Sequence, residues 1–263
     1  MQLQDKVIIV TGSTTGIGEA IARRCASEGA RVLIHGRDAK RGTEVVNDIG
    51  PSARLHTDDL SDAEAAPRLI QAAIDAFGKL DGIVNNAAYI LRSEIHNTDA
   101  ATFDRVMAIN VRAPLLLIRA GLKHLLRTEG SVVNIGSINA YTGEARQLAY
   151  SISKGALMTL SRNLANVLTP DRVRITHFNV GWVLTPNEYK LKMSEGLPEG
   201  WPDLPNPVGM PTGKMTRPEN IATHAAFWLS DESRPITGSV IDLEQYPVIG
   251  RLPLNEGDKD KSP

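Results

Sequence analysis

Short apolar runs rich in β-branched residues recur along this chain, and longer segments with apolar residues at helical spacing separate them. The apolar runs cover residues 7–10, 31–35, 53–57, 81–86, 130–137, 173–180 and 238–243. The helical segments include 18–29, 63–78, 102–126, 148–168 and 218–230. Strands that are apolar on both faces and alternate with helices form parallel sheets covered on both sides. The pattern therefore predicts a doubly wound α/β domain with a parallel sheet of about seven strands.

One segment, residues 186–218, interrupts this alternation. It is rich in proline and glycine, which disfavour a continuous helix or a central strand. Its apolar side chains are those of Tyr189, Leu191, Met193, Leu197, Trp201, Leu204 and Met210. A loop of this length inside a compact domain is either functional or disordered, and the apolar side chains favour a lid over a substrate.

The length and composition fit one domain. The chain has 263 residues, of which 42% are hydrophobic, and this is enough to form a single core. We expect the domain to cover residues 1–254 and the polar residues 255–263 to form a flexible tail.

The charge pattern argues against a polyanionic partner. Lys and Arg total 29 and Asp and Glu total 30, so we expect neither nucleic acid nor a membrane surface as a partner. Residues 1–12 contain only a short apolar run, too short for a signal peptide or a membrane span, which favours a cytoplasmic protein. Cys25 is the single cysteine and is expected in the core, and the histidines lack the spacing of metal ligands. No disulfide and no metal site are therefore expected.

Three glycines follow the first predicted strand and precede the first predicted helix. They are Gly12, Gly16 and Gly18. Glycine at such a turn allows a tight bend, close approach of the backbone to a diphosphate and close packing of the helix on the sheet. The amino terminus of the helix then faces the phosphates. This context predicts that the turn binds a dinucleotide.

Further motifs extend this pattern along the chain. They are Thr11-Gly12-x-x-x-Gly16-Ile17-Gly18, Asn85-Asn86-Ala87, Asn110, Ser137 and Tyr150-x-x-x-Lys154. From about residue 5 to about residue 245 the chain resembles the short-chain dehydrogenase/reductase family, in its shorter single-domain form. The resemblance implies a Rossmann-like fold, a nicotinamide cofactor, and hydride exchange between that cofactor and a ketone or secondary alcohol of a small molecule.

By this resemblance the cofactor would contact several parts of the chain. They are Gly12, Ser13, Thr14, Thr15, Gly16, Ile17 and Gly18; Arg37; Asp59 and Leu60; Asn85, Asn86 and Ala87; Tyr150 and Lys154; and Gly181, Val183 and Thr185. Asp59 would accept a hydrogen bond from the adenine, beside Leu60, and Thr185 would hold the nicotinamide carboxamide. An alternative is that Asp59 or Ser61 caps the following helix.

Two positions depart from the family pattern. Ala88 stands where glycine is common, and Val180 stands where the family usually has proline before Gly181. Both positions would lie near the nicotinamide, so the wall of its site would differ there.

The end of the second strand selects between the two nicotinamide cofactors. A carboxylate there binds the ribose hydroxyls of NAD and repels the 2′-phosphate of NADP, whereas a basic residue pairs with that phosphate. Gly36 occupies the position at which NAD-dependent members often carry the acid, and Arg37 follows it. We expect NADP(H), with NAD(H) as the second choice because Asp38 comes next. The alternative for Arg37 is a solvated loop residue.

Tyr150 and Lys154 lie four residues apart in a helical segment, so both side chains are on one face. Tyrosine has an ordinary pKa of about 10, and a nearby ammonium stabilises its phenolate. This predicts Tyr150 as the acid and base of the reaction and Lys154 as the residue that lowers its pKa, together with the cationic nicotinamide.

Ser137 and Asn110 complete the predicted catalytic set by resemblance. Ser137 would orient and polarise the substrate carbonyl, and its alternative role is that of a turn or helix-cap serine. Asn110 would disturb its helix locally and hold a water that relays protons to Lys154. Its alternative is a buried amide that the backbone satisfies.

Other interpretations stay open at this level. The chain could be an NAD(H)-dependent alcohol or sugar dehydrogenase of the same family, or a dinucleotide-binding regulator without turnover. By analogy with the family we expect a homo-oligomer, either a dimer or a tetramer. The sequence does not identify the carbonyl or alcohol substrate.

Overall fold

Seven parallel strands form the centre of the molecule, which is known from a computed structural model that describes residues 1–206 and 209–249. The strands are β1 (Val7–Val10), β2 (Arg31–Gly36), β3 (Ala53–Thr57), β4 (Gly82–Asn85), β5 (Ser131–Ile135), β6 (Arg174–Val180) and β7 (Val240–Leu243). Their order in the sheet is β3-β2-β1-β4-β5-β6-β7. The predicted fold class is confirmed. The predicted tail, 255–263, and the last residues of the predicted domain lie outside the described residues.

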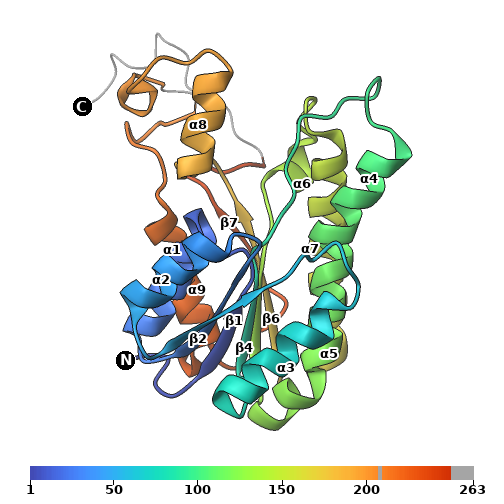
Figure 1. Cartoon of the computed structure of the whole chain (residues 1–263). Helices are drawn as coiled ribbons and strands as arrows, with labels where there is room; N and C mark the ends of the chain where they lie inside the picture. The colour runs from blue at the N-terminus through green and yellow to red at the C-terminus, as the bar shows by residue number, and fades with distance from the viewer. Residues whose placement is uncertain (207–208, 250–263) are drawn as a thin grey trace, which may run out of the picture.

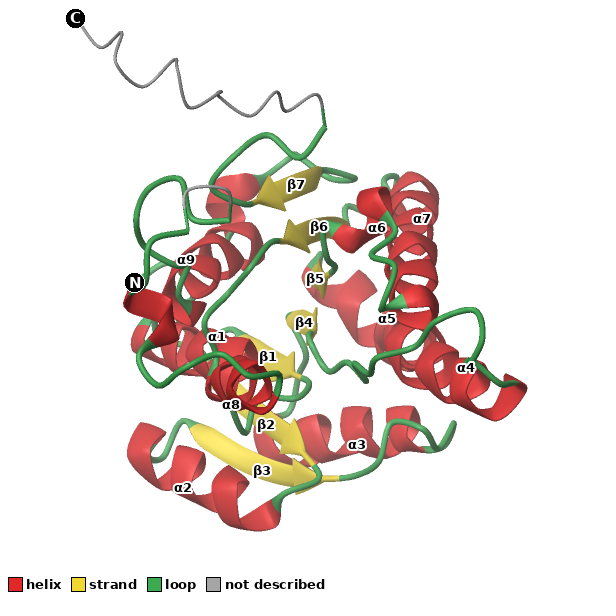
Figure 2. Ribbon diagram, turned by 90° about the horizontal axis from the view of Figure 1, so that it is seen from above, coloured by secondary structure: helices red, strands yellow, loops and turns green. Residues whose placement is uncertain are grey.

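Helices cover both faces of the sheet (Figure 1). On one face lie α1 (Gly16–Ser27), α2 (Ala39–Ile49) and α9 (Pro218–Leu229), and on the other lie α3 (Ala65–Phe77), α5 (Ala113–Thr128) and α7 (Leu148–Leu168). Figure 2 shows the same two layers from above. Among the described residues, no helix is long and apolar enough to cross a membrane.

The two layers explain why the strands have no polar face. In β1, Ile8 and Val10 pack into the apolar cluster beneath α1 and α9, whereas Ile9 packs into the cluster beneath α3 and α5. All three side chains are fully buried. Because alternate residues of a strand point to opposite faces, a sheet covered twice requires apolar residues at every position. Cys25 is buried in the first cluster, as predicted, and burial raises the pKa of its thiol to about 12.

Shorter elements surround the carboxyl ends of the strands. They are α4 (Ala100–Met107), a π-helical turn (Ala108–Arg112), α6 (Asn139–Thr142), α8 (Pro186–Ser194) and a 3₁₀ turn (Trp201–Asp203). A second 3₁₀ turn, Asp231–Ser233, follows α9 at the amino ends of the strands. In Figure 1, α8 rises above the sheet on the side of α1 and α2, and α4 and α6 rise on the other side.

The predicted lid segment contains more regular structure than its composition indicates, because α8 occupies its beginning. Pro186 is the first helical residue, where its missing N–H removes no hydrogen bond. The hydroxyl of Thr185 accepts a hydrogen bond from the Glu188 N–H at 3.0 Å and so caps the helix. The helix ends before Gly196, which has a φ angle of 98°, so the prolines of the segment do not prevent a helix at its beginning.

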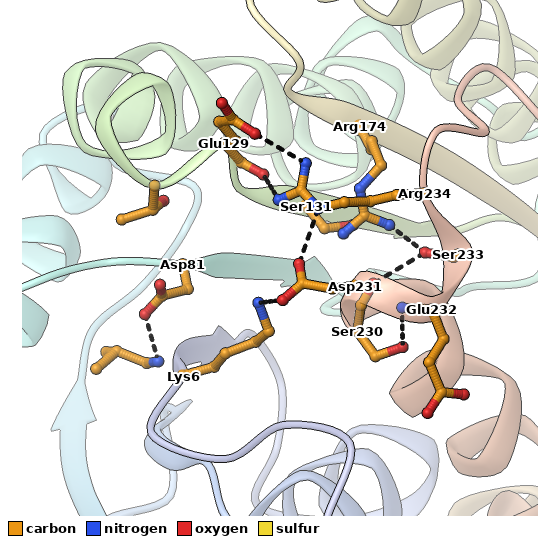
Figure 3. Close-up of polar contacts among 12 residues, drawn as sticks. Lys6, Asp81, Glu129, Ser131, Arg174, Ser230, Asp231, Glu232, Ser233 and Arg234 are labelled. Carbon is orange, nitrogen blue, oxygen red and sulfur yellow. Dashed lines mark hydrogen bonds and ion pairs between the residues drawn. The ribbon is translucent and has the colours of Figure 1, made fainter.

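Polar contacts join the loops at the amino ends of the strands (Figure 3). The Arg234 guanidinium donates to the backbone oxygen of Glu129 at 2.6 Å and to the carboxylate of Asp231 at 2.9 Å. A further bond of 3.3 Å reaches the Glu129 carboxylate. Arg234 therefore connects the end of α5 with the segment that follows α9.

Replacement of Arg234 by alanine should lower the free energy of unfolding by about 1–2 kcal/mol, because a helix-terminal carbonyl and two carboxylates lose their donor. Arg23 is the matched control, since it also binds two carboxylates but no carbonyl. Arg23→Ala should cost less than about 1 kcal/mol. Urea unfolding measures both changes, and equal losses would contradict the role of the carbonyl bond.

Candidate active site

The turn between β1 and α1 has the geometry that its glycines predict. Gly12 and Gly16 have φ angles of 63° and 61°, which residues other than glycine rarely adopt. A Cβ atom on Gly12 would lie 2.9 Å from the Cα of Ala87, and one on Gly18 would overlap the Gly12 carbonyl. The backbone is therefore packed without room for side chains, and the amino terminus of α1 is open to an anion. This arrangement fits the diphosphate of a dinucleotide.

Asn86 and Thr11 hold this turn against β4. The Asn86 amide donates to the carbonyl of Thr11 at 2.9 Å and to that of Gly12 at 3.1 Å. The Thr11 hydroxyl accepts from the N–H groups of Asn86 and Ala87, both at 3.0 Å. The side-chain donors of Asn86, a predicted cofactor residue, thus support the turn itself.

Ser13 and His35 attach the turn to β2. The Ser13 hydroxyl donates to Val10 O at 2.7 Å and accepts from His35 N at 3.0 Å. The Gly12 N–H faces His35 Nδ1 at 3.4 Å. Because Ser13 is fully buried, its side chain faces the sheet. Sequence reasoning missed His35, which ends an ordinary apolar strand and carries no motif.

The edge beside β2 carries no carboxylate at the position that selects the cofactor. A Cβ on Gly36 would lie 2.6 Å from the methyl group of Thr14, so Thr14 fills the space that a side chain at position 36 would need. Asp38 caps α2, where it accepts from the Arg41 N–H at 3.1 Å, and it also pairs with the Arg41 guanidinium at 3.3 Å. Arg37 is exposed and makes no ion pair within the described ranges, 1–206 and 209–249.

A cavity of about 340 Å³ adjoins this edge. Its lining residues are Thr14, Thr15, Glu19, Arg23, Arg41, Glu44, Val45, Asp48, Pro186, Asn187 and Lys190. Thr15 is the N-cap residue of α1, and its hydroxyl makes no capping hydrogen bond. The cavity therefore offers hydroxyl groups and cations beside the glycine turn, below the start of α8.

Asp59 and Leu60 follow β3. The Asp59 carboxylate accepts from the Ser61 N–H at 2.9 Å, and this bond, more than the nearby Arg37, lowers the pKa of Asp59. Leu60 is buried in a small cluster that includes Ala87. The alternative that Asp59 or Ser61 caps the next helix is wrong, because α3 begins at Ala65 after Glu64.

Ser137, Tyr150 and Lys154 come together where β5 ends and α7 begins. They are 9%, 8% and 2% exposed. The Ser137 hydroxyl hydrogen-bonds Tyr150 and also accepts from the Asn139 N–H at 3.2 Å, so it serves the turn as well. The Lys154 ammonium lies 5.4 Å from the centre of the Tyr150 ring.

Burial shifts the pKa values of Tyr150 and Lys154 in opposite directions. Burial raises the pKa of Tyr150 to about 12, the charge of Glu188 adds to this, and the Ser137 hydrogen bond opposes it. Burial also lowers the pKa of Lys154 to about 8, although its Nζ donates to the carbonyl of Ile135 at 2.7 Å. Burial is therefore the largest influence on both pKa values, and the lowering of the Tyr150 pKa by Lys154 together with a cationic nicotinamide stays a prediction.

Asn110 lies in the π-helical turn between α4 and α5, so the predicted local disturbance of the helix is confirmed. Its amide accepts from Tyr89 N at 2.7 Å and donates to Tyr89 O at 3.2 Å. It also donates to the Ser153 hydroxyl at 2.9 Å. The backbone and Ser153 therefore satisfy the amide directly.

The segment after β6 covers the site from above. Thr185 packs against the glycine turn, where a Cβ on Gly16 would lie 3.4 Å from its methyl group. A Cβ on Gly181 would overlap the carboxylate of Glu244, which accepts from the Trp182 N–H at 3.0 Å. Val183 is buried and pairs with Thr216. The predicted residues of this segment thus lie between the glycine turn and the lid.

Aromatic rings of the predicted lid segment stack on Trp182, which precedes it. Trp182 and Trp201 stack with ring centres 5.4 Å apart, and Tyr189 stacks on Trp201. The Trp182 indole donates to Glu188 at 2.8 Å. Glu195 binds both Arg92 and Lys192 and so connects α8 with the loop after β4.

The two departures from the family pattern have mild structural effects. Val180 completes β6, and its carbonyl accepts from the Ile138 N–H at 3.1 Å, next to Ser137. Ala88 is exposed. Residues 1–206 and 209–249 contain no group of three or more side chains that could hold a metal ion.

Comparisons with known proteins agree with this geometry. Residues 12–244 match the family model described as Enoyl-(Acyl carrier protein) reductase. An NADP-dependent (R)-specific alcohol dehydrogenase of Lentilactobacillus kefiri is 30% identical over 245 residues, which cover 90% of this chain and 94% of that protein.

Two solved structures are similar along most of the chain. A 3-ketoacyl-(acyl-carrier-protein) reductase from Brucella melitensis, complexed with NADH, has a TM-score of 0.81 at 28% identity and covers 91% of this chain and 97% of its own. A 3-oxoacyl (acyl-carrier-protein) reductase from Agrobacterium tumefaciens, with NADP bound, has a TM-score of 0.82 at 29% identity, with coverages of 92% and 93%. The chain belongs to the short-chain dehydrogenase/reductase family and is an oxidoreductase that acts on CH–OH or C=O groups with NAD(P).

Two buried histidines make stability depend on pH. Burial lowers the pKa of His35 to about 4 and that of His177 to about 3, from an ordinary value of about 6.5. The folded state favours the neutral rings, so their contribution is complete above about pH 6.5 and is lost as the pH falls towards 4. The free energy of unfolding should decrease by about 2–5 kcal/mol between pH 7 and pH 4.5.

Urea unfolding at several pH values measures this decrease. His35→Gln should flatten the pH dependence, whereas His96→Gln, at an exposed position, should leave it unchanged. Carboxylates such as Asp58, whose pKa is lowered to about 2 by Arg68, contribute mainly below pH 4 and so do not interfere. A free energy of unfolding that is constant from pH 7 to pH 4.5 would contradict the lowered pKa values of His35 and His177.

Proposed function

We propose that this protein is an NADP(H)-dependent oxidoreductase that exchanges a hydride between the nicotinamide and a ketone or secondary alcohol of a small molecule. The observation that supports this most is the buried group of Ser137, Tyr150 and Lys154 at the carboxyl ends of the strands. Ligands of open α/β sheets bind at this edge. A regulator that only binds the dinucleotide would not need this set of residues.

In this proposal the bound nicotinamide supplies or accepts the hydride. Ser137 hydrogen-bonds the substrate oxygen and orients it beside the Tyr150 hydroxyl. Tyr150 donates its proton to that oxygen during reduction and takes it back during oxidation. Lys154 holds positive charge beside the phenol, and Asn110 shapes the turn through which a water would return protons to Lys154.

The cofactor would lie along the glycine turn. The backbone of residues 12–18 would hold the diphosphate, Asp59 and Leu60 would border the adenine, and Val183 and Thr185 would border the nicotinamide. Asn85 and Ala87 would line the middle of the site. NADP(H) is favoured over NAD(H) because Thr14 fills the space beside Gly36, Asp38 already caps α2, and Arg37 is exposed at the same edge.

We also propose a homo-oligomer, either a dimer or a tetramer. Large apolar side chains are exposed on the outer faces of α5 and α7, namely Leu115, Leu126, Ile152 and Val167. Contact with a second copy would remove them from water. Light scattering at several protein concentrations tests this proposal.

Replacement of Tyr150 by phenylalanine should lower kcat at least about 100-fold, because the acid that meets the substrate oxygen is lost. The dissociation constant for NADPH should change less than about threefold, since the glycine turn is untouched. NADPH absorbance with a panel of ketones measures turnover, and NADPH fluorescence measures binding. Retained turnover would remove Tyr150 from the mechanism.

Replacement of Arg37 by alanine should weaken NADPH binding about 10- to 100-fold and leave NADH binding almost unchanged, because only NADPH carries a 2′-phosphate. Arg54→Ala is the control, since Arg54 is an exposed arginine of β3. Titrations of both cofactors measure the ratio. Equal losses for NADPH and NADH would contradict the cofactor assignment.

A further inference from the structure

A chain of hydrogen bonds runs through the protein interior beneath the candidate active site. It joins Asn85, Asn134, Ser161, His177, Asn179 and Asp242. Its links measure 2.8, 2.8, 3.0, 3.1 and 3.0 Å. It crosses β4, β5, α7, β6 and β7 in turn, and none of the mechanistic steps proposed above uses His177.

The exposed end fixes the direction of the bonds between Asp242, Asn179 and His177. The Asp242 carboxylate can only accept, so the Asn179 amide donates to it and turns its oxygen towards His177. His177 then donates from Nε2 to that oxygen. The Ser161 hydroxyl lies 3.0 Å from Nδ1 and donates to the carbonyl of Leu157 at 2.7 Å, so its one hydrogen is shared between these two acceptors. Asn134 in turn donates to Ser161. The tautomer of His177 that is protonated on Nε2 therefore satisfies Asn179 and leaves Nδ1 facing the Ser161 hydroxyl.

The His177 ring also lies directly against the strand that leads to Ser137. A Cβ on Gly136 would overlap the ring at Nε2 and would lie 2.8 Å from the Phe178 carbonyl. The Gly136 N–H donates to that carbonyl at 2.6 Å. The glycine is thus required because the imidazole occupies the space that a side chain would take. Ser137 is the next residue.

The same ring is close to the helix that carries the other reacting residues. Its partner Ser161 lies on α7, and the positive charge of Lys154 acts on the ring. Lys154 holds the carbonyl of Ile135, which lies between Asn134 of the chain and Gly136. The imidazole therefore touches both elements that must be aligned for the Ser137 and Tyr150 hydroxyls to meet.

We propose that His177, in its neutral form with the proton on Nε2, is a positioning residue for the reaction. It fixes the Gly136–Ser137 segment of β5 relative to α7, and the hydrogen-bond chain to Asp242 holds its ring in place. This inference rests on the proposed function, because the alignment matters for turnover at Ser137 and Tyr150.

His177→Leu should lower kcat about 10- to 100-fold, because small displacements of reacting groups are costly, and leave the NADPH dissociation constant within about threefold. The glutamine of His177→Gln can still accept from Ser161 and donate to Asn179. The kcat of this variant should therefore be at least about tenfold higher than that of His177→Leu. Thr176→Val is the control on the same strand. Thr176 is fully buried, and its hydroxyl has no partner in the described residues, so this variant should keep its kcat.

A second pair of variants tests the contact with Gly136. Gly136→Ala should lower kcat at least about tenfold, because its methyl group meets the ring. The double variant Gly136→Ala, His177→Ala should recover part of this loss. These two variants test the contact between His177 and Gly136 even where His177→Leu does not fold. A Gly136→Ala enzyme as active as the unmodified protein would overturn the proposal, as would a folded His177→Leu enzyme with unchanged kcat.

A spectroscopic measurement separates this inference from the proposed function. Long-range ¹H–¹⁵N spectra of the histidine rings should show His177 neutral and protonated at Nε2, and a ring protonated at Nδ1 would overturn the proposal. An unmodified protein that binds NADPH but reduces no ketone of the panel would refute the proposed function instead. The stability coupling between Gly136→Ala and His177→Ala would then still test the contact.

Discussion

A single ammonium group in the protein interior constrains the arrangement of the site. Lys154 is 2% exposed, and its Nζ donates to the carbonyl of Ile135 at 2.7 Å. A buried charge is costly unless it is hydrogen-bonded, so α7 must lie where the last residue of β5 can offer that oxygen. Tyr150 is one turn earlier on α7, and Ser137 is two residues beyond Ile135. The bond that accommodates the ammonium thus also brings the two hydroxyl groups together.

Close backbone packing has the corresponding role at the glycine turn. Gly12, Gly18 and Gly136 each lie where a Cβ would meet another group. This group is the backbone of Ala87 at Gly12, the Gly12 carbonyl and the Asn86 amide at Gly18, and the His177 ring at Gly136. Asn86 holds the carbonyls of the turn, and His177 lies on Gly136. The missing side chains therefore allow polar contacts between strands that a larger residue would separate. The sheet thus connects the glycine turn with the segment that carries Ser137.

The sequence predicted the helices and strands well because the spacing of their apolar residues and the residues at their termini are both local features of the sequence. The segment 148–168 and the helix α7 coincide, and the disturbance of the helix at Asn110 was foreseen. It predicted less well where the composition of a segment hid a short local signal, as at α8, or where distant residues decide the outcome. α8 forms in a segment rich in proline because Thr185 caps it, and neither His35 nor His177 belongs to a motif. The pKa of Tyr150 depends on burial, which the four-residue spacing to Lys154 does not reveal.

That protonation state bears on how the site works. With a pKa of about 12, Tyr150 is protonated at neutral pH, and the Lys154 amine, with a pKa of about 8, is mostly charged. A protonated phenol next to an ammonium is the state that reduction requires, since an alkoxide forming on the substrate takes the proton. Oxidation requires the phenolate, which the protein's own groups disfavour, partly through Glu188 on the lid. The positive charge of an oxidised nicotinamide would therefore have to offset the burial, so the state of the cofactor and the state of Tyr150 are coupled.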